Sequence, residues 1–94
     1  MYTMIVRMSL DPARLDEVDR HFEQDVVPWA KRGDGFVDGR WLRSADGKQG
    51  LGIVVYESEQ AAQAAADGPR RYARVDGRAW NIDEVVLFDQ VAEA

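Results

Sequence analysis

Hydrophobic and polar residues alternate at the start of the chain, in residues 2–9. Tyr2, Met4, Val6 and Met8 form a wholly apolar set, whereas the interleaved set is mixed. Successive side chains of a strand point to opposite faces of its sheet. The pattern therefore predicts a strand with one face packed under helices and the other face in a less dry environment.

The pattern then becomes helical, because apolar residues recur at spacings of three and four over four turns: Leu15, Val18, Phe22, Val26 and Trp29. Asp11 and Pro12 predict the start of this helix, since Asp is a good N-cap and Pro suits the first helical position. Arg32 lies near the C-terminal end of the predicted helix, where the helix dipole favours a positive charge. Pro28 is expected to kink or end the helix near its last turn, and Gly33 to stop it.

Two strand-like runs follow, residues 36–43 and 51–56, on either side of a turn cluster that contains Asp46-Gly47. If the first run alternates strictly, Phe36, Asp38, Arg40 and Leu42 lie on the same face of the strand. The second run is apolar on both faces, where Leu51, Ile53 and Val55 oppose Gly52, Val54 and Tyr56. A strand that is apolar on both faces needs cover on both sides of its sheet.

A second helix is expected from Ser58, a good N-cap, over residues 59 to about 66. Asp67-Gly68-Pro69 is expected to end it, because Gly caps helices and Pro prevents continuation. A further helical piece is expected over residues 70–75. The last strand, about residues 82–91, is again apolar on both sides.

The resulting element order is β-α-β-β-α-β, which predicts a ferredoxin-like α+β fold in a single domain, residues 1–94. In this fold a four-stranded antiparallel sheet carries both helices on one face. Two helices cover only that face, so the apolar residues on the other face predict a second copy of the chain as their cover.

The chain resembles the antibiotic-biosynthesis-monooxygenase-like superfamily of dimeric α+β barrel proteins. The resemblance is carried by Asp11-Pro12 before the long first helix, by Gly35-Phe36 at the second strand, and by Val55-Tyr56-Glu57-Ser58-Glu59 before the second helix. It implies a homodimer in which two sheets pack through their helix-free faces into an α+β barrel. The superfamily includes oxygenases, isomerases, haem-degrading enzymes, stress proteins and ligand sensors, so the fold alone says little about activity.

The haem-degrading members of that superfamily use a histidine ligand late in the chain and an asparagine on the first strand. Residues 2–9 contain no asparagine here, and the one histidine, His21, lies in the first predicted helix. With no cysteine and one histidine, the sequence also lacks the usual ligands of a zinc site. No cofactor and no metal are therefore expected.

The composition of the chain reduces the number of expected classes of binding partner. The 94 residues carry 12 basic and 17 acidic side chains, a net charge of −5, which argues against nucleic acid as a partner. No apolar run approaches the roughly 20 residues of a membrane span, and no basic region leads into a long apolar run. A cytoplasmic protein with no membrane partner is expected, and its remaining partners are a second copy and a small hydrophobic or aromatic molecule.

Two charged residues are candidates for chemistry. His21 has Asp25 four residues on, so it is either a general base oriented by that carboxylate or a histidine at the surface or at the edge of a groove; the second interpretation is favoured. Arg7, mid-strand among apolar neighbours, is either one half of a salt bridge at the dimer interface, which is favoured, or a ligand clamp. Its expected partners are Asp38, Asp83 or Asp89.

Aromatic side chains with polar tips can line a pocket for a flat organic molecule, although packing explains any single one better. The candidates are Trp41, Tyr56, Tyr72 and Trp80. Asn81 either caps the entry to the last strand or orients a ligand carbonyl. The basic cluster of Arg70, Arg71, Arg74 and Arg78 either attracts an anionic molecule or, as is favoured, is a solvated helix face.

Two function classes remain open. The first is a small cofactor-independent monooxygenase-like enzyme that acts on an aromatic or quinol-type metabolite. Its catalytic candidates are His21, Tyr72 and Trp80, and its substrate-binding candidates are Trp41, Arg74, Asn81 and Arg7. The alternative is a non-catalytic dimeric protein that binds a small molecule or serves as an accessory module.

Overall fold

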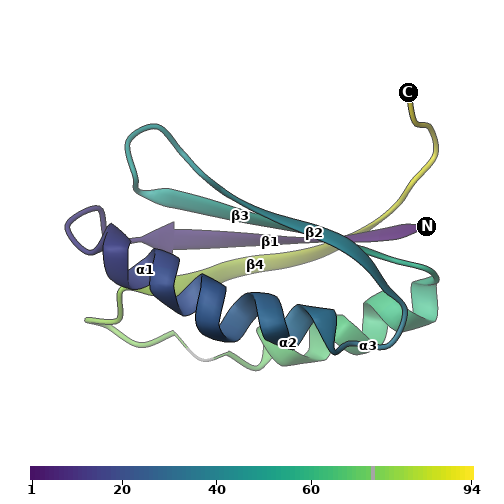
Figure 1. Cartoon of the computed structure of the whole chain (residues 1–94), viewed down its shortest axis with the longest axis horizontal. Coiled ribbons are helices and arrows are strands. Elements are labelled where there is room, and N and C mark those ends of the chain that lie inside the picture. The colour runs from purple at the N-terminus through teal and green to yellow at the C-terminus, as the bar shows by residue number, and fades with distance from the viewer. Residues whose placement is uncertain (73) are drawn as a thin grey trace.

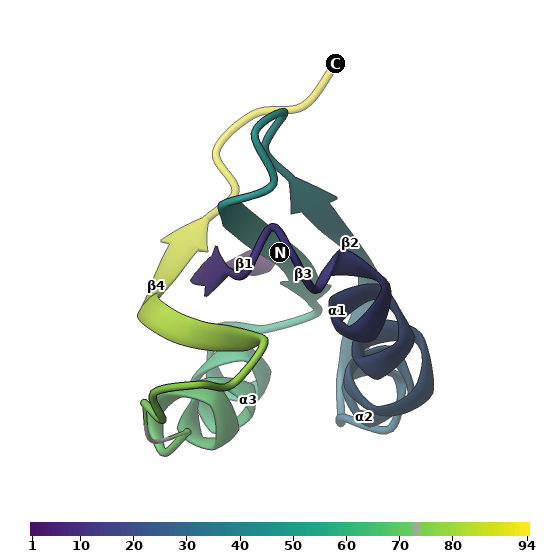
Figure 2. The same ribbon diagram turned by 90° about the vertical axis from the view of Figure 1, so that its left-hand side faces the viewer.

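The chain folds into a four-stranded antiparallel sheet with its helices on one face, in a computed structural model that describes residues 1–72 and 74–94. In chain order the elements are β1 (Tyr2–Leu10), α1 (Leu15–His21), the π-helix η1 (Phe22–Val26), α2 (Val27–Lys31), β2 (Phe36–Arg43), β3 (Gln49–Tyr56), α3 (Glu59–Arg70) and β4 (Trp80–Asp89). The strand order is β2-β3-β1-β4. Figures 1 and 2 show the helices on one side of the sheet, with α1 and α2 beside α3. The ferredoxin-like fold predicted from the sequence is confirmed.

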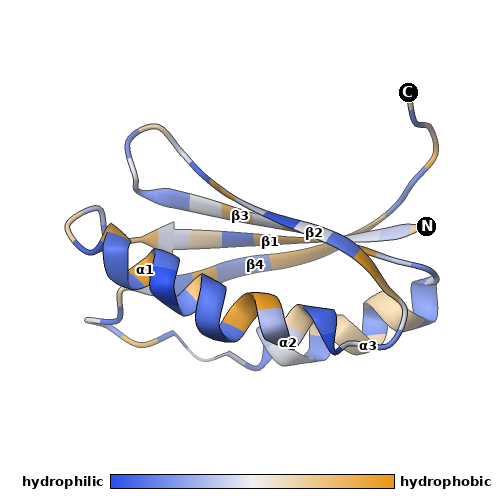
Figure 3. Ribbon diagram, viewed as in Figure 1, coloured by the Kyte–Doolittle hydropathy of each residue, from blue (hydrophilic) through white to orange (hydrophobic). Residues whose placement is uncertain are grey.

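The core lies between this sheet and its helices. The alternation in β1 buries the expected side chains, and Met4, Val6 and Met8 are each at most 7% exposed. Small side chains bring α3 close to the sheet, where Ala62 and Ala66 are completely buried. Figure 3 shows that apolar segments are interleaved with polar ones along both helices and strands, as amphipathic elements require.

The first helix begins later than Asp11-Pro12 predicts. The Asp11 carboxylate accepts a hydrogen bond from the Ala13 backbone, and the Arg14 N–H donates to the Asp11 carbonyl. These bonds close a separate turn over residues 11–14. Helix α1 starts after Arg14, whose backbone is not helical and whose side chain makes no capping bond. Asp11 therefore stabilises a turn before the helix instead of capping it.

Pro28 does not end the helix; it stands in the first turn of α2, directly after a π-helix. The backbone widens into the π-helix η1 just before it, and α2 continues to Lys31. A proline ring clashes with the carbonyl four residues earlier in a regular α-helix, and a wider turn moves that carbonyl. Arg32 closes α2, and the first left-handed residue after the helix is Gly35 and not Gly33.

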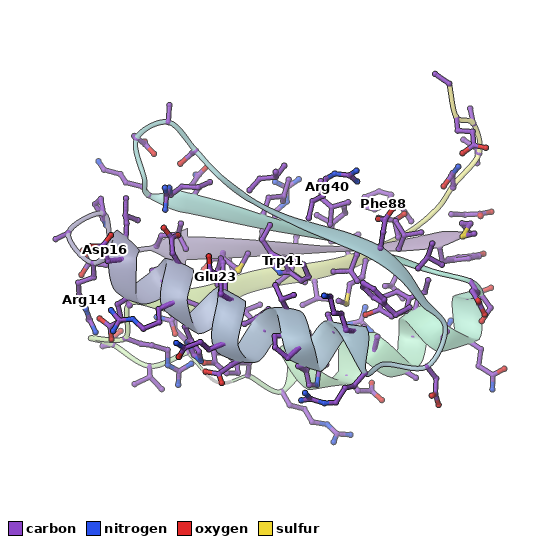
Figure 4. All side chains as sticks on the ribbon, in the orientation of Figure 1. Arg14, Asp16, Glu23, Arg40, Trp41 and Phe88 are labelled. Carbon is purple, nitrogen blue, oxygen red and sulfur yellow. The ribbon has the colours of Figure 1, made fainter. Side chains whose placement is uncertain are left out.

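A bulge at the start of β2 changes which of its residues share a face, so the predicted alternation is wrong at Phe36. Phe36 pairs with Tyr56 and Asp38 pairs with Val55, so the intervening residue has no partner. This shift puts Phe36 on the helix side together with Trp41, and not with Asp38. Figure 4 shows the Trp41 side chain on the helix side of the sheet.

Helix α3 continues through Gly68 and Pro69 to Arg70, although these residues were expected to end it. Ser58 caps its N-terminus as predicted, since its hydroxyl accepts from the Ala61 N–H. The prediction of a further helical piece over residues 70–75 is wrong for the described residues. Arg71 closes α3, and no helix follows it among the described residues before β4. Ala73 lies outside the described residues.

The helix-free face of the sheet carries a row of apolar residues. Ile53, Ile5 and Val86 stand side by side across three strands. Leu42 and Phe88 on the same face are 47% and 53% exposed. This face is what the predicted second copy would cover, and the homodimer stays a prediction. None of the helices in the described residues is long and apolar enough to cross a membrane.

Candidate functional site

A cavity of about 550 Å³ lies between the helices and the sheet. Its floor is formed by the buried face of β1 and by Val54 of β3, and its walls come from η1, α2, α3 and the segment that leads into β4. The lining residues are Met4, Val6, Met8, His21, Gln24, Asp25, Val26, Pro28, Trp29, Arg32, Trp41, Val54, Gly68, Pro69, Tyr72, Trp80 and Ile82. The volume is in the range of pockets that take organic ligands.

One wall is a stack of aromatic rings. The Tyr72 and Trp80 rings lie nearly parallel, 5.2 Å apart, and Phe22 meets Trp80 edge-on at 5.1 Å. The Arg78 guanidinium covers the Tyr72 ring at 4.3 Å. Trp80 is only 5% exposed, so packing fixes the position of this stack in the cavity wall. Tyr72 and Trp80, expected at a site, are thus brought together there.

His21 is held on both sides of its ring. The Trp80 indole N–H donates to His21 Nδ1 at 2.8 Å, and His21 Nε2 lies 3.1 Å from the Asp25 carboxylate. An indole N–H is a donor only, so Nδ1 must carry the lone pair and Nε2 the hydrogen. The groove-edge interpretation agrees with this geometry. Asp25 orients the ring as expected, but the lone pair that a general base needs is already used by Trp80.

Replacing His21 is expected to destabilise the protein through Trp80. His21→Ala leaves the buried indole N–H without its acceptor, which costs about 1–3 kcal/mol of unfolding free energy. His21→Gln keeps an acceptor oxygen and a donor for Asp25, so it is expected to recover most of that loss. Urea unfolding of the two variants measures the difference, and equal losses would show that the Trp80 bond contributes nothing.

The facing sides of α2 and α3 contribute one part of the cavity lining. Trp29, 39% exposed, lies over Gly68, where an added Cβ would come within 3.0 Å of the indole. This contact favours glycine at position 68 of α3, because an added Cβ would press against the Trp29 ring and the ring would have to shift. Arg32, the residue that closes α2, also lines the cavity.

Sequence reasoning missed part of this wall. Trp29 was assigned to the core and Arg32 to the helix dipole. The missing signal was a second stripe beside the apolar one, since Asp25, Trp29 and Arg32 follow His21 at offsets of four, eight and eleven residues. These offsets fall on one side of a helix.

Of the next two candidates, Trp41 belongs to the cavity lining and Asn81 does not. Trp41 lines the cavity and packs across Gly52 of the neighbouring strand. Asn81 is buried, and its side-chain amide bonds both backbone groups of Val75, so it holds the loop before β4. It is not among the lining residues, and both its oxygen and its nitrogen already have protein partners.

Two arginines lie away from the cavity. Arg74 pairs with Asp83 at 2.8 Å and does not line the cavity. Arg7 lies on the helix-free face, and its partner is Glu84, directly across from it on β4, at 3.1 Å. The expected partners Asp38, Asp83 and Asp89 are wrong in this chain, because the register places Glu84 opposite Arg7.

Tyr56 is completely buried, as the packing interpretation expects. Burial raises the pKa of its hydroxyl above the usual value, and this oxygen has no hydrogen-bond partner among the described residues. It is not one of the cavity-lining residues.

Solved structures with similar folds include several oxygenases. The chain is similar to MhuD, a heme-degrader from Mycobacterium tuberculosis with two hemes bound in its active site, at 18% identity over 100% of this chain and 99% of that chain, with a TM-score of 0.75. It is similar to a monooxygenase from the gene ActVA-Orf6 of Streptomyces coelicolor in complex with nanaomycin D, at 17% identity over 99% and 89% of the chains, with a TM-score of 0.67. It is also similar to SnoaB, a cofactor-independent oxygenase from Streptomyces nogalater, at 20% identity over 98% and 94%, with a TM-score of 0.63.

The chain has the ferredoxin-like fold of antibiotic-biosynthesis-monooxygenase-like proteins. No protein-family model and no curated protein sequence matches it. At these identities the similarity to solved structures establishes the fold, and the activity has to be argued from the site.

In this monooxygenase-like fold, the present chain is a poor host for haem. His21 is the only histidine in the sequence, and both of its ring nitrogens are engaged within the protein. No cluster of three or more potential metal-binding side chains occurs in residues 1–72 and 74–94.

Proposed function

We propose that the chain is a small cofactor-independent oxygenase that acts on an aromatic or quinol-type molecule bound in the cavity. The observation that carries this proposal is the 550 Å³ cavity with the stacked Tyr72 and Trp80 rings as one wall. A flat, electron-rich ring is complementary to such a wall. The oxygenases among proteins of the same fold also support the proposal.

The reaction needs little from the protein. A phenol that has lost its hydroxyl proton is electron-rich enough to react with oxygen. One oxygen atom replaces hydrogen on the ring, the other leaves as water, and the phenol becomes a para-quinone. The substrate supplies all four electrons, so no external reductant is required. The protein supplies a cavity, a fixed orientation and an acceptor for the proton.

Asp25 is the better candidate for this acceptor. His21 uses Nδ1 to accept from Trp80 and donates through Nε2 to Asp25. A carboxylate has about four acceptor positions, of which His21 takes one. Asp25 lines the cavity, so a substrate hydroxyl bound there can donate to it. In this assignment Asp25 is the catalytic residue and His21 positions both Asp25 and Trp80.

We also propose that the working form is a homodimer, joined through the helix-free faces of its two sheets. The apolar row of Ile53, Ile5 and Val86 supports this assembly, as do the exposed Leu42 and Phe88. Exposed apolar patches of this kind typically mark an interface between proteins.

Oxygen uptake tests the activity. The purified protein is mixed with a panel of two- and three-ring phenols and hydroquinones, and oxygen consumption is compared with protein-free solutions. Asp25→Asn is expected to lower the protein-dependent rate about 100-fold or more, since that is the usual contribution of a positioned base. Glu23→Gln is the matched control, because it removes the same charge from the same π-helix outside the cavity lining.

The non-catalytic alternative has one observation in its favour, the engagement of both His21 nitrogens. It predicts that the same compounds bind in the cavity and that none of them causes oxygen uptake above the protein-free rate. That result would replace the oxygenase proposal with a binding function.

A further inference from the structure

The hydrogen bond between Trp80 and His21 requires a neutral histidine. The Trp80 indole N–H donates to His21 Nδ1 at 2.8 Å, and an indole offers no acceptor in return. A protonated imidazole carries hydrogen on both nitrogens, so it would turn a second donor toward the Trp80 N–H. Turning the ring over does not help, because the other nitrogen then faces Trp80 and carries hydrogen as well. Proton uptake by His21 therefore breaks this bond in either ring orientation.

The two partners of this bond differ in how deeply they are buried. Trp80 is 5% exposed and is held by Phe22, edge-on at 5.1 Å, and by the nearly parallel ring of Tyr72 at 5.2 Å. The His21 side chain is 38% exposed. When the bond breaks, the imidazolium can therefore turn toward water, whereas the indole N–H stays in the wall without its acceptor.

Exposed carboxylates on the same helical run give a charged His21 somewhere to turn. Asp25 lies 3.1 Å from His21 Nε2, and Glu17, four residues before His21, interacts with it electrostatically. A hydrogen bond from Arg14 holds the pKa of the Glu17 carboxyl below its usual value, so Glu17 is ionised where imidazoles titrate. Asp25 is 67% exposed, so water screens its attraction, and it orients the ring without fixing it.

The charges on the other side of His21 do not favour an imidazolium that stays against the cavity wall. Trp80 of β4 is uncharged, and Tyr72 stacks on it with the Arg78 guanidinium 4.3 Å above the Tyr72 ring. Among the described residues that line the cavity, Arg32 is a further cation. The carboxylates that can attract a protonated His21 are thus on its own helical run and not on the side of Trp80.

We propose that proton uptake by His21 is a pH-dependent switch that frees Trp80 from its hydrogen bond and loosens the aromatic wall of the cavity. With His21 neutral, the bond ties the end of α1 to the start of β4. With His21 charged, the imidazolium turns toward Asp25, and ring packing alone holds Trp80. Histidine is the side chain whose charge ordinarily changes between about pH 5 and pH 8. The switch is independent of the proposed oxygenase activity, because both bonds of His21 lie within the protein.

Nuclear magnetic resonance observes both partners of the bond in the isotope-labelled full chain. His21 is the only histidine in the sequence, so its ring signals need no assignment, and the Trp80 indole signal is identified by its loss in Trp80→Phe. The titration runs from about pH 8 to about pH 5. At the basic end, we expect hydrogen on His21 Nε2 and a coupling between Trp80 Nε1 and His21 Nδ1 across the hydrogen bond.

As His21 takes up its proton, that coupling is expected to disappear, and the Trp80 indole proton is expected to move upfield with the same midpoint as the His21 ring signals. The indole signals of Trp29 and Trp41 are internal controls and are expected to stay in place. His21→Gln keeps an acceptor oxygen that does not titrate, so its Trp80 signal is expected to stay fixed over the whole range.

Three results would overturn the switch. The first is hydrogen on His21 Nδ1, or no coupling to Trp80, at the basic end. The second is a Trp80 signal that stays fixed while His21 titrates, or a His21 that takes up no proton in the folded chain over this range. The third is a Trp80 signal in His21→Gln that moves as in the unmodified chain, since another group then causes the shift. If His21→Gln does not fold, the titration of the unmodified chain decides by itself.

Discussion

Replacing Ile53 with lysine is expected to convert the proposed dimer to a monomer. Ile53 stands in the apolar row of the helix-free face, paired with Ile5 on one side and Arg40 on the other. Two sheets that pack through these faces would bury a lysine from each copy in an apolar layer. An unpaired buried charge is costly, so the dimer is expected to weaken at least about 100-fold.

Light scattering at micromolar concentration measures this change. The unmodified chain is expected at twice the 10.6 kDa of one copy, and Ile53→Lys at 10.6 kDa. Ala64→Lys is the control, since it adds the same charge on the exposed side of α3, away from the sheet. A single-copy mass for the unmodified chain would refute the dimer, and a dimeric Ile53→Lys would place the interface elsewhere.

The sequence predicts the elements of this fold well where one face of an element is buried. In β1, strict alternation identified Met4, Val6 and Met8 as core residues, and all three are buried. It failed in β2, because one unpaired residue after Phe36 turns that side chain to the helix side. A bulge depends on the partner strand, so a single strand's own pattern does not reveal it.

Proline and glycine residues show a second limit of predicting helix ends from the local sequence. Gly68 and Pro69 look like a helix end, yet α3 passes through both. The reason lies on another helix, because Trp29 packs where a Gly68 side chain would be. Local rules describe what a residue can do in isolation, and a tertiary contact decided this position.

The site was predictable in parts only. The spacing of His21 and Asp25 on one helix gave their contact, since four residues bring two side chains onto one face. The contact of His21 with Trp80 joins residues 59 positions apart. No local pattern encodes it. This bond occupies the Nδ1 lone pair that a base would need, which is why we propose a positioning role for His21.

Gly35→Ala is expected to cost about 2–5 kcal/mol of unfolding free energy. Gly35 has a left-handed backbone, with φ of 75°, which costs an alanine about 1–2 kcal/mol. Its new Cβ would also come within 2.7 Å of the Ala61 Cβ at the start of α3, and overpacking of this kind adds about 1–3 kcal/mol. The Gly35 carbonyl accepts from the Glu57 N–H, so the backbone cannot move away freely.

Gly77 separates the two costs. Its φ is 86°, and an added Cβ would meet nothing within 4 Å, so Gly77→Ala is expected to lose only the backbone part, about 1–2 kcal/mol. Urea unfolding at one protein concentration compares the variants, since the stability of a dimer depends on concentration. Adding Ala61→Gly to Gly35→Ala removes the clash at a helix-propensity cost of about 1 kcal/mol. If Gly35→Ala loses no more than Gly77→Ala, the loop before β2 absorbs the contact, and close packing against α3 is not what requires glycine there.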